Sequence, residues 1–592
     1  MNLQQNLQKA MLMFQANNLS EAKKILLKLV KKFPSDANIY GNLALIHIRE
    51  NSAIQAQEMF QKSLKIDPRN YGVLRNFINF MIQSKSWEQI IKIYPGYVHV
   101  LNNPELRLLF DMYYAIALRE TGMLEEALAI FENLLLKYPE NESLILAYGF
   151  SYNKAGKYLD AIEIYKKGLN VSKNNLALNY NMGVTYANIK EYPKSNEFLM
   201  AAAQINPNEF GIWITLASNY TKLNKIEKAY ECIEECKKID PNNLLINYQL
   251  GYISSHTGDR QKSIEFIKQV LHQDPNHIEA NYFMGILHLE SEMYENIMQY
   301  YRYRTVRENN RHGTFDDFVL PEIRLEDDVL IGKEQGVGDQ LLFFRLIDSF
   351  IEKVNSITYI SEPRLKNIIS KLYPKIKVIL DDEYNNDKEK YKTYKKINLA
   401  SIIHYVDNIP ETLREKSKKN IKENSKNNTN TNIRKIGISW KSKADKDGIE
   451  KSIQLEDLIE IFRINNCVFV NLQYGDVEQE INEFTQKHNI QIRYDNNIDY
   501  SNDFDRLTKL IEDCDEVITI SNFTVHLAGT LNKQTSLLLP KVVGRKWYWC
   551  NDEEEYSIWY PSVKKYVQDT DGEWKEPIQK LAKDLETRIQ TK

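Results

Sequence analysis

The sequence predicts an α-solenoid followed by an α/β module made of two lobes. Prolines and small residues recur with a 34-residue period up to about residue 310, and short β-branched runs alternate with helical stretches beyond it. A break rich in Lys and Asn divides the α/β part in two. We therefore expect repeats at 1–310, a first lobe at 311–414, a linker at 415–434, and a second lobe with a terminal helix at 435–592.

Composition narrows the class of protein. The chain has 592 residues, of which 43% are hydrophobic, and a formal net charge of −3. Because positive and negative charges nearly balance, the chain as a whole does not attract nucleic acid electrostatically. Its five cysteines are too few for a disulfide scaffold. No apolar run reaches the ~20 residues that cross a bilayer. We expect a cytoplasmic protein with no nucleic-acid partner and no membrane span.

The repeat frame is marked by proline. Twelve residues before most of these prolines stands a small residue, and twenty-four before stands Ala or Gly, which permits close helix contacts. The pattern resembles the tetratricopeptide repeat, a pair of antiparallel helices, and about nine units fit it. The resemblance implies a superhelix whose concave groove holds a protein or peptide. The prolines in this frame are Pro34, Pro68, Pro207, Pro241 and Pro275, with Pro139 after a three-residue slip.

Asparagine and tyrosine recur at one phase of the repeats. Asparagine can bond an extended peptide backbone, and tyrosine adds flat contact area, so these residues are candidates for the acceptor groove. The alternative is that they pack or cap within the repeat. The candidates are Asn179, Tyr180, Asn181, Asn247, Tyr248, Asn281 and Tyr282.

Eight β-branched runs mark the strands of the α/β part. Because parallel strands bring their carboxyl ends to one edge, the motifs that follow them should meet at a cleft. The linker between the lobes carries lysines without interleaved aromatics, which favours a solvated tether over a nucleic-acid site. The expected strands are 328–332, 356–361, 376–380, 435–440, 467–472, 490–494, 516–520 and 536–539.

A glycine turn follows the first strand. Gly336 and Gly338 can bring bare amides close to an anion before a helix that opens near Asp339. The segment lacks the third glycine of a dinucleotide fingerprint and the GK[ST] of a P-loop, so it does not favour hydride transfer or nucleotide hydrolysis.

A second turn follows the strand at 516–520. The segment SNFTVHLAGTL enters a helix, with His526 in its first turn. Exposed amides at 523–526, the hydroxyls of Ser521 and Thr524, and His526 would suit a pyrophosphate. The alternative is a histidine that only caps its helix.

Five segments together resemble the carboxyl-terminal module of bacterial tetratricopeptide proteins related to the heptosyltransferase-like glycosyltransferases. That resemblance implies a GT-B fold of two Rossmann-like lobes, with the nucleotide-sugar donor held mainly by the second. No metal or other obligatory cofactor is expected. The segments are EQGVGDQLLFFRL, GISWKS with KSIQLEDL, LQYGD, ISNFTVHLAGTLNKQTSLLLP and WYPS.

The resemblance also assigns roles. Asp339 matches the general base, although Asp is also a common helix N-cap. Lys451 matches a donor-phosphate contact, with Lys441 as a second candidate, and Gln473 and Tyr474 lie where relatives place the nucleobase. Many relatives have Asp-Thr where this chain has Ser521 and Asn522, which leaves the donor's identity open.

The sequence therefore favours an inverting glycosyltransferase that moves a sugar to a hydroxyl of a protein held by the repeats. Flagellin is one acceptor that this analogy suggests. The alternative is a non-catalytic repeat scaffold with a degenerate transferase-like module.

Overall fold

The protein was analysed as a computed structural model that describes residues 2–99, 101–306, 313–316, 318–414, 433–443, 448, 450–551 and 553–590. The chain divides into two compact units, Met1–Pro241 and Asn242–Lys592. This boundary lies between two repeats and not near residue 310, where the repeat period ends. Most of the expected linker at 415–434 lies outside the described residues.

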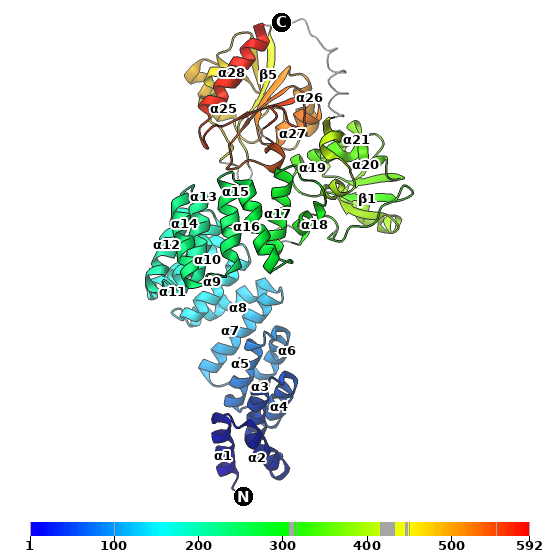
Figure 1. Cartoon of the computed structure of the whole chain (residues 1–592). Coiled ribbons are helices and arrows are strands. Elements are labelled where there is room, and N and C mark those ends of the chain that lie inside the picture. The colour runs from blue at the N-terminus through cyan, green and yellow to red at the C-terminus, as the bar shows by residue number, and fades with distance from the viewer. Residues whose placement is uncertain are drawn as a thin grey trace. The chain divides into compact units, whose positions relative to one another are not determined.

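In the part of the first unit that the structure describes, fourteen helices follow one another as seven pairs. Figure 1 shows how these helices are stacked. Asparagine or aspartate side chains cap many first helices, as Asn70 does by accepting from the amide of Val73. The helices are α1 (Leu3–Gln15), α2 (Leu19–Lys32), α3 (Ala37–Arg49), α4 (Ala53–Ile66), α5 (Tyr71–Gln83), α6 (Trp87–Tyr97), α7 (Pro104–Glu120), α8 (Leu124–Lys137), α9 (Glu142–Lys154), α10 (Tyr158–Val171), α11 (Leu176–Asn188), α12 (Tyr192–Ile205), α13 (Phe210–Lys222) and α14 (Ile226–Ile239).

Small residues allow the paired helices to touch, as the 34-residue pattern predicts. A Cβ added to Gly183 would lie 2.6 Å from Leu199, so only glycine fits there. The Ser195 hydroxyl donates to the Gly183 carbonyl at 2.7 Å, which fastens the two helices of that repeat.

The second unit begins with one more pair, α15 (Leu244–His256) and α16 (Arg260–Gln273), followed by α17 (Ile278–Glu290). The ninth repeat is incomplete: in place of a long second helix come α18 (Met298–Tyr301) and the 3-10 turn η1 (Arg302–Thr305). Met298 and Tyr301 are buried in a cluster shared with the α/β part, so packing against that part replaces the helix pair.

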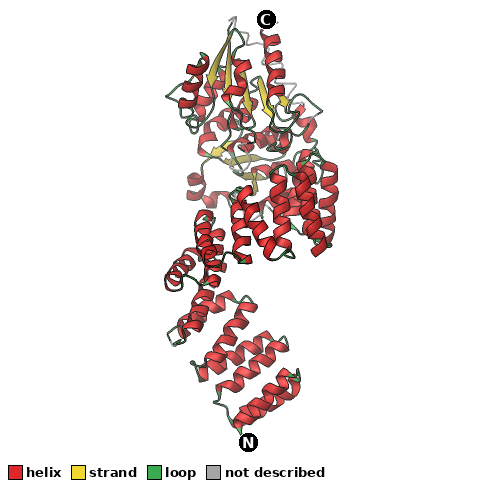
Figure 2. Ribbon diagram, turned by 90° about the vertical axis from the view of Figure 1, so that its left-hand side faces the viewer, coloured by secondary structure: helices red, strands yellow, loops and turns green. Residues whose placement is uncertain are grey.

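Two parallel sheets form the α/β part (Figure 2). The first sheet has the order β3-β2-β1-β4 and the second the order β10-β9-β8-β5-β6-β7. The strands are β1 (Asp328–Gly332), β2 (Ser356–Ile360), β3 (Lys377–Ile379), β4 (Lys395–Asn398), β5 (Arg434–Ser439), β6 (Cys467–Asn471), β7 (Ile492–Arg493), β8 (Glu516–Ile520), β9 (Thr535–Leu539) and β10 (Val563–Val567).

Helices connect these strands and cover the sheets. The helices are α19 (Val337–Phe343), α20 (Ile347–Ile351), α21 (Lys366–Leu372), α22 (Asp381–Asn386), α24 (Ile459–Phe462), α25 (Glu478–His488), α26 (Phe504–Glu512), α27 (Phe523–Thr530) and α28 (Lys575–Gln590). Three of the 3-10 turns are η2 (Phe344–Leu346), η5 (Leu399–His404) and η7 (Trp547–Trp549).

All eight expected strands are present, and the sequence analysis missed two, β4 and β10. Each lies at the edge of its sheet. Their sequences KKIN and VKKYV carry paired lysines, a composition that keeps edge strands from pairing with other chains and also hides the strand pattern.

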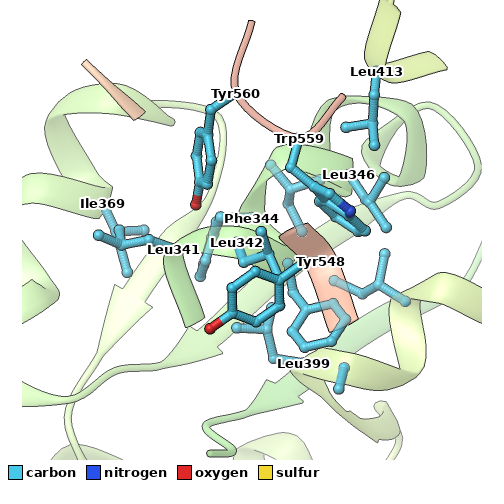
Figure 3. Packing of buried hydrophobic residues seen from close by; sticks show 14 of the residues in the cluster. Leu341, Leu342, Phe344, Leu346, Ile369, Leu399, Leu413, Tyr548, Trp559 and Tyr560 are labelled. Carbon is cyan, nitrogen blue, oxygen red and sulfur yellow. The ribbon is translucent and has the colours of Figure 1, made fainter. Parts of the chain in front are cut away.

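One hydrophobic cluster joins the end of the repeats to both lobes. Figure 3 shows Tyr548, Trp559 and Tyr560 of the second lobe lying among leucines of the first, such as Leu341 and Leu346. The lobes are therefore packed against each other through a shared apolar core. Among the described residues, no helix is long and apolar enough to cross a membrane.

Candidate functional site

The second sheet has a topological switch point between β5 and β8. From β5 the chain builds outward through β6 and β7, then returns beside β5 with β8 and continues to β9 and β10. In doubly wound sheets, ligands bind at the carboxyl ends of the strands at such a point. The segments after β5, β6 and β8 include most of the residues that the sequence predicts to bind a donor.

A buried polar network shapes this edge. The Gln473 side-chain oxygen accepts from the amides of Trp440 and Lys441, at 2.8 Å and 2.7 Å. The Asn522 amide nitrogen donates to the Ser439 hydroxyl at 2.7 Å. Gln473 and Asn522 therefore hold the loop after β5 in place, a role that the sequence analysis did not foresee.

The hydroxyls predicted for a pyrophosphate are also buried. Ser521 Oγ accepts from the indole nitrogen of Trp549 at 3.0 Å. Asn522 is the N-cap of α27, and its side-chain oxygen accepts from the Thr524 amide at 3.0 Å. One backbone amide in the first turn of α27 is therefore already hydrogen-bonded inside the protein. The Thr524 amide is not the exposed donor that we expected.

Tyr474 lies at the same edge and is half-buried. Its hydroxyl accepts from the Lys443 amide at 3.1 Å. The ring therefore braces the loop that continues from β5.

His526 lies in an aromatic enclosure. It is 3% exposed, and its Nδ1 lies 3.2 Å from the Tyr560 hydroxyl. The rings of Tyr548 and Trp549 have centroids 5.2 Å and 5.6 Å from that of His526. Burial, aided by the charge of Lys451, lowers the pKa of His526 to about 3. The imidazole is therefore neutral at physiological pH and brings no positive charge to an anion.

The two motif turns meet across the lobes. Gly336 is the N-cap of α19, and Gly338 lies in its first turn. A Cβ added to Gly338 would lie 2.7 Å from Cδ2 of His526, so the glycine backbone touches the imidazole. The glycine turn of the first lobe and α27 of the second therefore border one site.

Asp339 is half-buried at this border. Burial raises the pKa of its carboxyl, while Lys546, the Gly336 amide, the Tyr548 hydroxyl and Lys451 act in the opposite direction. The bond from Gly336 is a helix-capping bond, so the capping alternative holds in part. A capping role alone does not account for two lysines whose charges act on the carboxyl.

The two candidate lysines differ in position. Lys451 is 4% exposed, and its charge acts on both Asp339 and His526. Lys441 instead lies 2.6 Å from Glu480 of α25. Lys451 is therefore the lysine that joins the site, and Lys441 is engaged elsewhere.

Sequence reasoning missed Lys546, and the fold brings Tyr548 to the site together with it. Both belong to GRKWYW, around η7, and both act on the Asp339 carboxyl. A basic residue beside aromatic ones was the available signal, but only the fold brings this segment to α19.

Two of the candidate groove residues bond within their own repeats. Asn179 and Asn281 are each 4% exposed. The Asn179 amide donates to the carbonyls of Lys173 and Asn175, and the Asn281 amide to those of Pro275 and His277, at 2.9–3.0 Å. The geometry of these two residues therefore favours capping within the repeat over peptide binding.

Their neighbours are less buried. The Asn181 amide donates to the Ala177 carbonyl at 2.9 Å, one helical turn back. Asn247 is half-buried. These residues keep a part of their surface accessible.

The tyrosines pack between successive elements and remain half-buried. Tyr180 lies against Gly211, where an added Cβ would be 2.8 Å from its hydroxyl. The Tyr248 ring stacks on His277 with centroids 5.9 Å apart, and the Tyr282 ring on Tyr301 at 6.5 Å. The Tyr180 and Tyr248 rings therefore contribute to the contact between one repeat and the next, and the Tyr282 ring contributes to packing within the ninth repeat.

The fold defines the class: a tetratricopeptide-repeat protein that continues into an α/β module with two parallel sheets. Two tetratricopeptide-repeat family models match residues 6–36 and 37–70. A third model, ChAPs (Chs5p-Arf1p-binding proteins), matches residues 109–265, within the helical repeats.

Among known proteins, the chain is similar to Protein FlbA of Caulobacter vibrioides, with 25% identity over 292 residues. That match covers 45% of this chain and 48% of FlbA, so the chain spans about half the length of this relative.

Solved structures similar to part of the chain are also repeat proteins. A tetratricopeptide repeat protein from Parabacteroides merdae is 15% identical, with a TM-score of 0.36, over 42% of this chain and 97% of its own. TTC0263 from Thermus thermophilus is 16% identical, with a TM-score of 0.28, over 31% and 99%.

Alanine substitutions at two glycines of the turn test the contact between the lobes. Gly338→Ala should destabilise the protein by about 1–3 kcal/mol, because the new methyl group meets a His526 ring that its neighbours hold in place. Gly336→Ala is the matched control, since its added Cβ lies at an ordinary 3.4 Å from Asp339. Thermal unfolding measures both variants. Equal melting temperatures for the two would show that the lobes do not fit as closely as described.

Proposed function

We propose that the chain is an inverting glycosyltransferase of the GT-B type, which moves a sugar from a nucleotide-sugar to a hydroxyl of a protein acceptor. The observation that carries this proposal is the setting of Asp339. A carboxyl with a raised pKa lies between two lobes, at the start of a helix, and faces lysines from the other lobe. Such a carboxyl is suited to general-base work near neutral pH.

The proposed reaction uses the groups around Asp339. The carboxylate takes the proton of the acceptor hydroxyl while that oxygen forms a bond to the anomeric carbon of the sugar. The bond from this carbon to the diphosphate oxygen breaks, and the nucleoside diphosphate leaves with the electron pair. Lys451 and Lys546 offset the charge that develops on the diphosphate. Attack opposite to the leaving group inverts the anomeric centre.

The second lobe is the proposed donor lobe. Its switch point between β5 and β8 is the place where doubly wound sheets hold nucleotides. The charge of Lys451 acts on His526, which follows β8. Gln473 and Asn522 support this edge by holding its loops, as their hydrogen bonds to Trp440, Lys441 and Ser439 indicate.

The repeats are the proposed acceptor-binding region. Tetratricopeptide arrays present extended surfaces to polypeptides, and the ChAPs family is described by the proteins that it binds. A protein partner is therefore the proposed occupant of the array. Flagellin is the acceptor that we would test first.

A second candidate is a scaffold without turnover. It is favoured by the neutral, enclosed His526. It is also favoured by Ser521 and Asn522, whose side chains are already hydrogen-bonded to other residues of this chain. A scaffold requires no donor site, so donor binding separates the two candidates.

The test of the proposal uses the full chain and a panel of nucleotide-sugars. At least one should raise the melting temperature and be hydrolysed slowly or transferred to a protein. Lys451→Met should weaken binding of that donor by about 10–100-fold, because a charge-assisted contact to phosphate is lost. Lys441→Met, the matched control, should stay within about twofold, because its ammonium pairs with Glu480.

Isothermal titration gives both affinities, and circular dichroism checks that each variant folds. If no nucleotide-sugar shifts the melting temperature of the wild type, the scaffold candidate replaces the enzyme.

A further inference from the structure

A buried arginine from the end of the repeats lies at the switch point of the first sheet. Arg304 belongs to η1 and is 1% exposed. Its Nε and Nη2 lie 2.6 Å and 3.1 Å from the two carboxylate oxygens of Glu334. Its Nη2 also donates to Ser401 Oγ at 2.7 Å. Glu334 follows β1 and Ser401 follows β4, and these strands are neighbours.

This position is the one where a doubly wound sheet holds a ligand. Here the chain fills it with its own residues. Asn398, the last residue of β4, bonds the backbone of Phe315 through both side-chain atoms, at 2.6 Å and 3.0 Å. Thr314 lies against Gly332 at the end of β1. The carboxyl edge of the first sheet is therefore tied to the chain that leads out of the repeats.

The same repeat segment holds the residue before the glycine turn. Gln335 has φ of +62°, in the left-handed region that non-glycine residues rarely adopt. Its side-chain nitrogen donates to the Tyr301 hydroxyl at 2.9 Å, and its carbonyl accepts from Gln340 at 3.3 Å. Glu334 is held by Arg304 on one side and by the Ala400 amide at 3.3 Å on the other.

The two residues that lead into Gly336 are thus fixed by two side chains of the ninth repeat. Arg304 meets Glu334 through two parallel contacts, a geometry that a lysine cannot reproduce. A turn held in an unfavourable conformation needs such support to persist. Asp339 lies four residues after Gln335, so its position depends on this support.

We infer that Arg304 is a positioning residue: through Glu334, and together with the Tyr301–Gln335 bond, it fixes the turn that presents Asp339 to the second lobe. The end of the repeat array is then a working part of the transferase. The effect on rate rests on the proposed function, whereas the effect on the turn does not.

The experiment compares Arg304→Lys and Tyr301→Phe with the wild type in the full chain. Amide hydrogen exchange of residues 335–340 should rise at least about tenfold in Arg304→Lys, with the second lobe unchanged. Tyr301→Phe removes a single oxygen and should raise exchange in the same segment to a smaller extent. The matched control is Arg414→Lys, which alters an exposed pair with Glu554 at 2.6 Å and should change nothing.

Kinetics supply the second readout. With the donor that the wild type uses, kcat should fall about tenfold in Arg304→Lys while the KM for the donor stays within about twofold, because the donor lies on the other lobe. Unchanged exchange at 335–340 in both variants would overturn the inference. A uniform rise across the whole unit would do the same, because Arg304 would then only stabilise the fold. A wild type inactive with every donor would defeat the proposed function alone, since the exchange pattern still decides the role of Arg304.

Discussion

Asp339→Asn should lower the rate of sugar transfer by about 10²–10⁴-fold while the protein stays folded. The amide cannot take the proton of the acceptor hydroxyl, but it keeps an oxygen for the bonds from the Gly336 amide and the Tyr548 hydroxyl. A transfer assay with the donor found in the panel measures the rate. Donor affinity should stay within about threefold, because the phosphate contacts come from lysines.

The same variant should be more stable than the wild type at neutral pH. Because burial raises the pKa of Asp339 in the fold, the ionised carboxyl is less favourable there than in the unfolded chain. The fold therefore loses stability as pH rises from the unfolded pKa through the raised one, and the loss persists above it. The melting temperature of Asp339→Asn should lie about 1–3 °C above that of the wild type at pH 7.5, and the difference should vanish in acid.

The rate of transfer should change with pH in the opposite direction, because the Asp339 carboxyl acts as a base only when it is ionised. Activity should fall as pH drops through the raised pKa of Asp339, at a higher pH than for an ordinary aspartate. Asp407→Asn, at an exposed carboxyl paired with Lys353, is the control and should leave the rate unchanged. Full transfer by Asp339→Asn would assign the base elsewhere.

A chain that begins at residue 311 should fail to fold, whereas one that begins at 242 should fold cooperatively. The shorter chain lacks Leu289, Ile297, Met298 and Tyr301, all at most 5% exposed in the cluster that joins both lobes. Loss of each large buried side chain costs about 2–5 kcal/mol. Removing Arg304 also leaves the buried Glu334 carboxylate without its ion-pair partner, which costs about 3–5 kcal/mol of stability. The total is comparable to or larger than the ~5–15 kcal/mol by which domains are stable.

Size-exclusion chromatography and thermal unfolding of the two chains measure this difference. The chain 242–592 should elute as a defined species with a single transition, and it should bind the donor as tightly as the full chain. A well-folded 311–592 chain would show that the ninth repeat is dispensable and would move the module boundary back to residue 310.

The sequence predicted the architecture well because its signals are local. Pro34, Pro68 and their successors mark the repeat frame, and runs such as DVLIG and EVITI mark buried parallel strands. About nine repeat units were expected up to residue 310, and the ninth is incomplete in the structure. Its second helix is replaced by contacts with residues far along the chain, such as Glu334, which no local pattern records.

Part of the candidate site comes from residues far apart in the sequence. Asp339, Lys451 and His526 come from three separate motifs, and the fold brings them together. Their protonation and the internal bonds of Asn522 could not be predicted, because both depend on burial by distant residues. Lys546 was missed for the same reason.

The incomplete ninth repeat also limits how the array can vary in length. Each of the first seven helix pairs packs against its neighbours within residues 1–241, so a 34-residue unit could be gained or lost there with only local repair. The last repeat units cannot be gained or lost in this way, because their side chains belong to the core of the module and to the turn before Asp339. Related chains should therefore differ in repeat number near the amino terminus, and an engineered exchange of binding arrays should join the new array before residue 242.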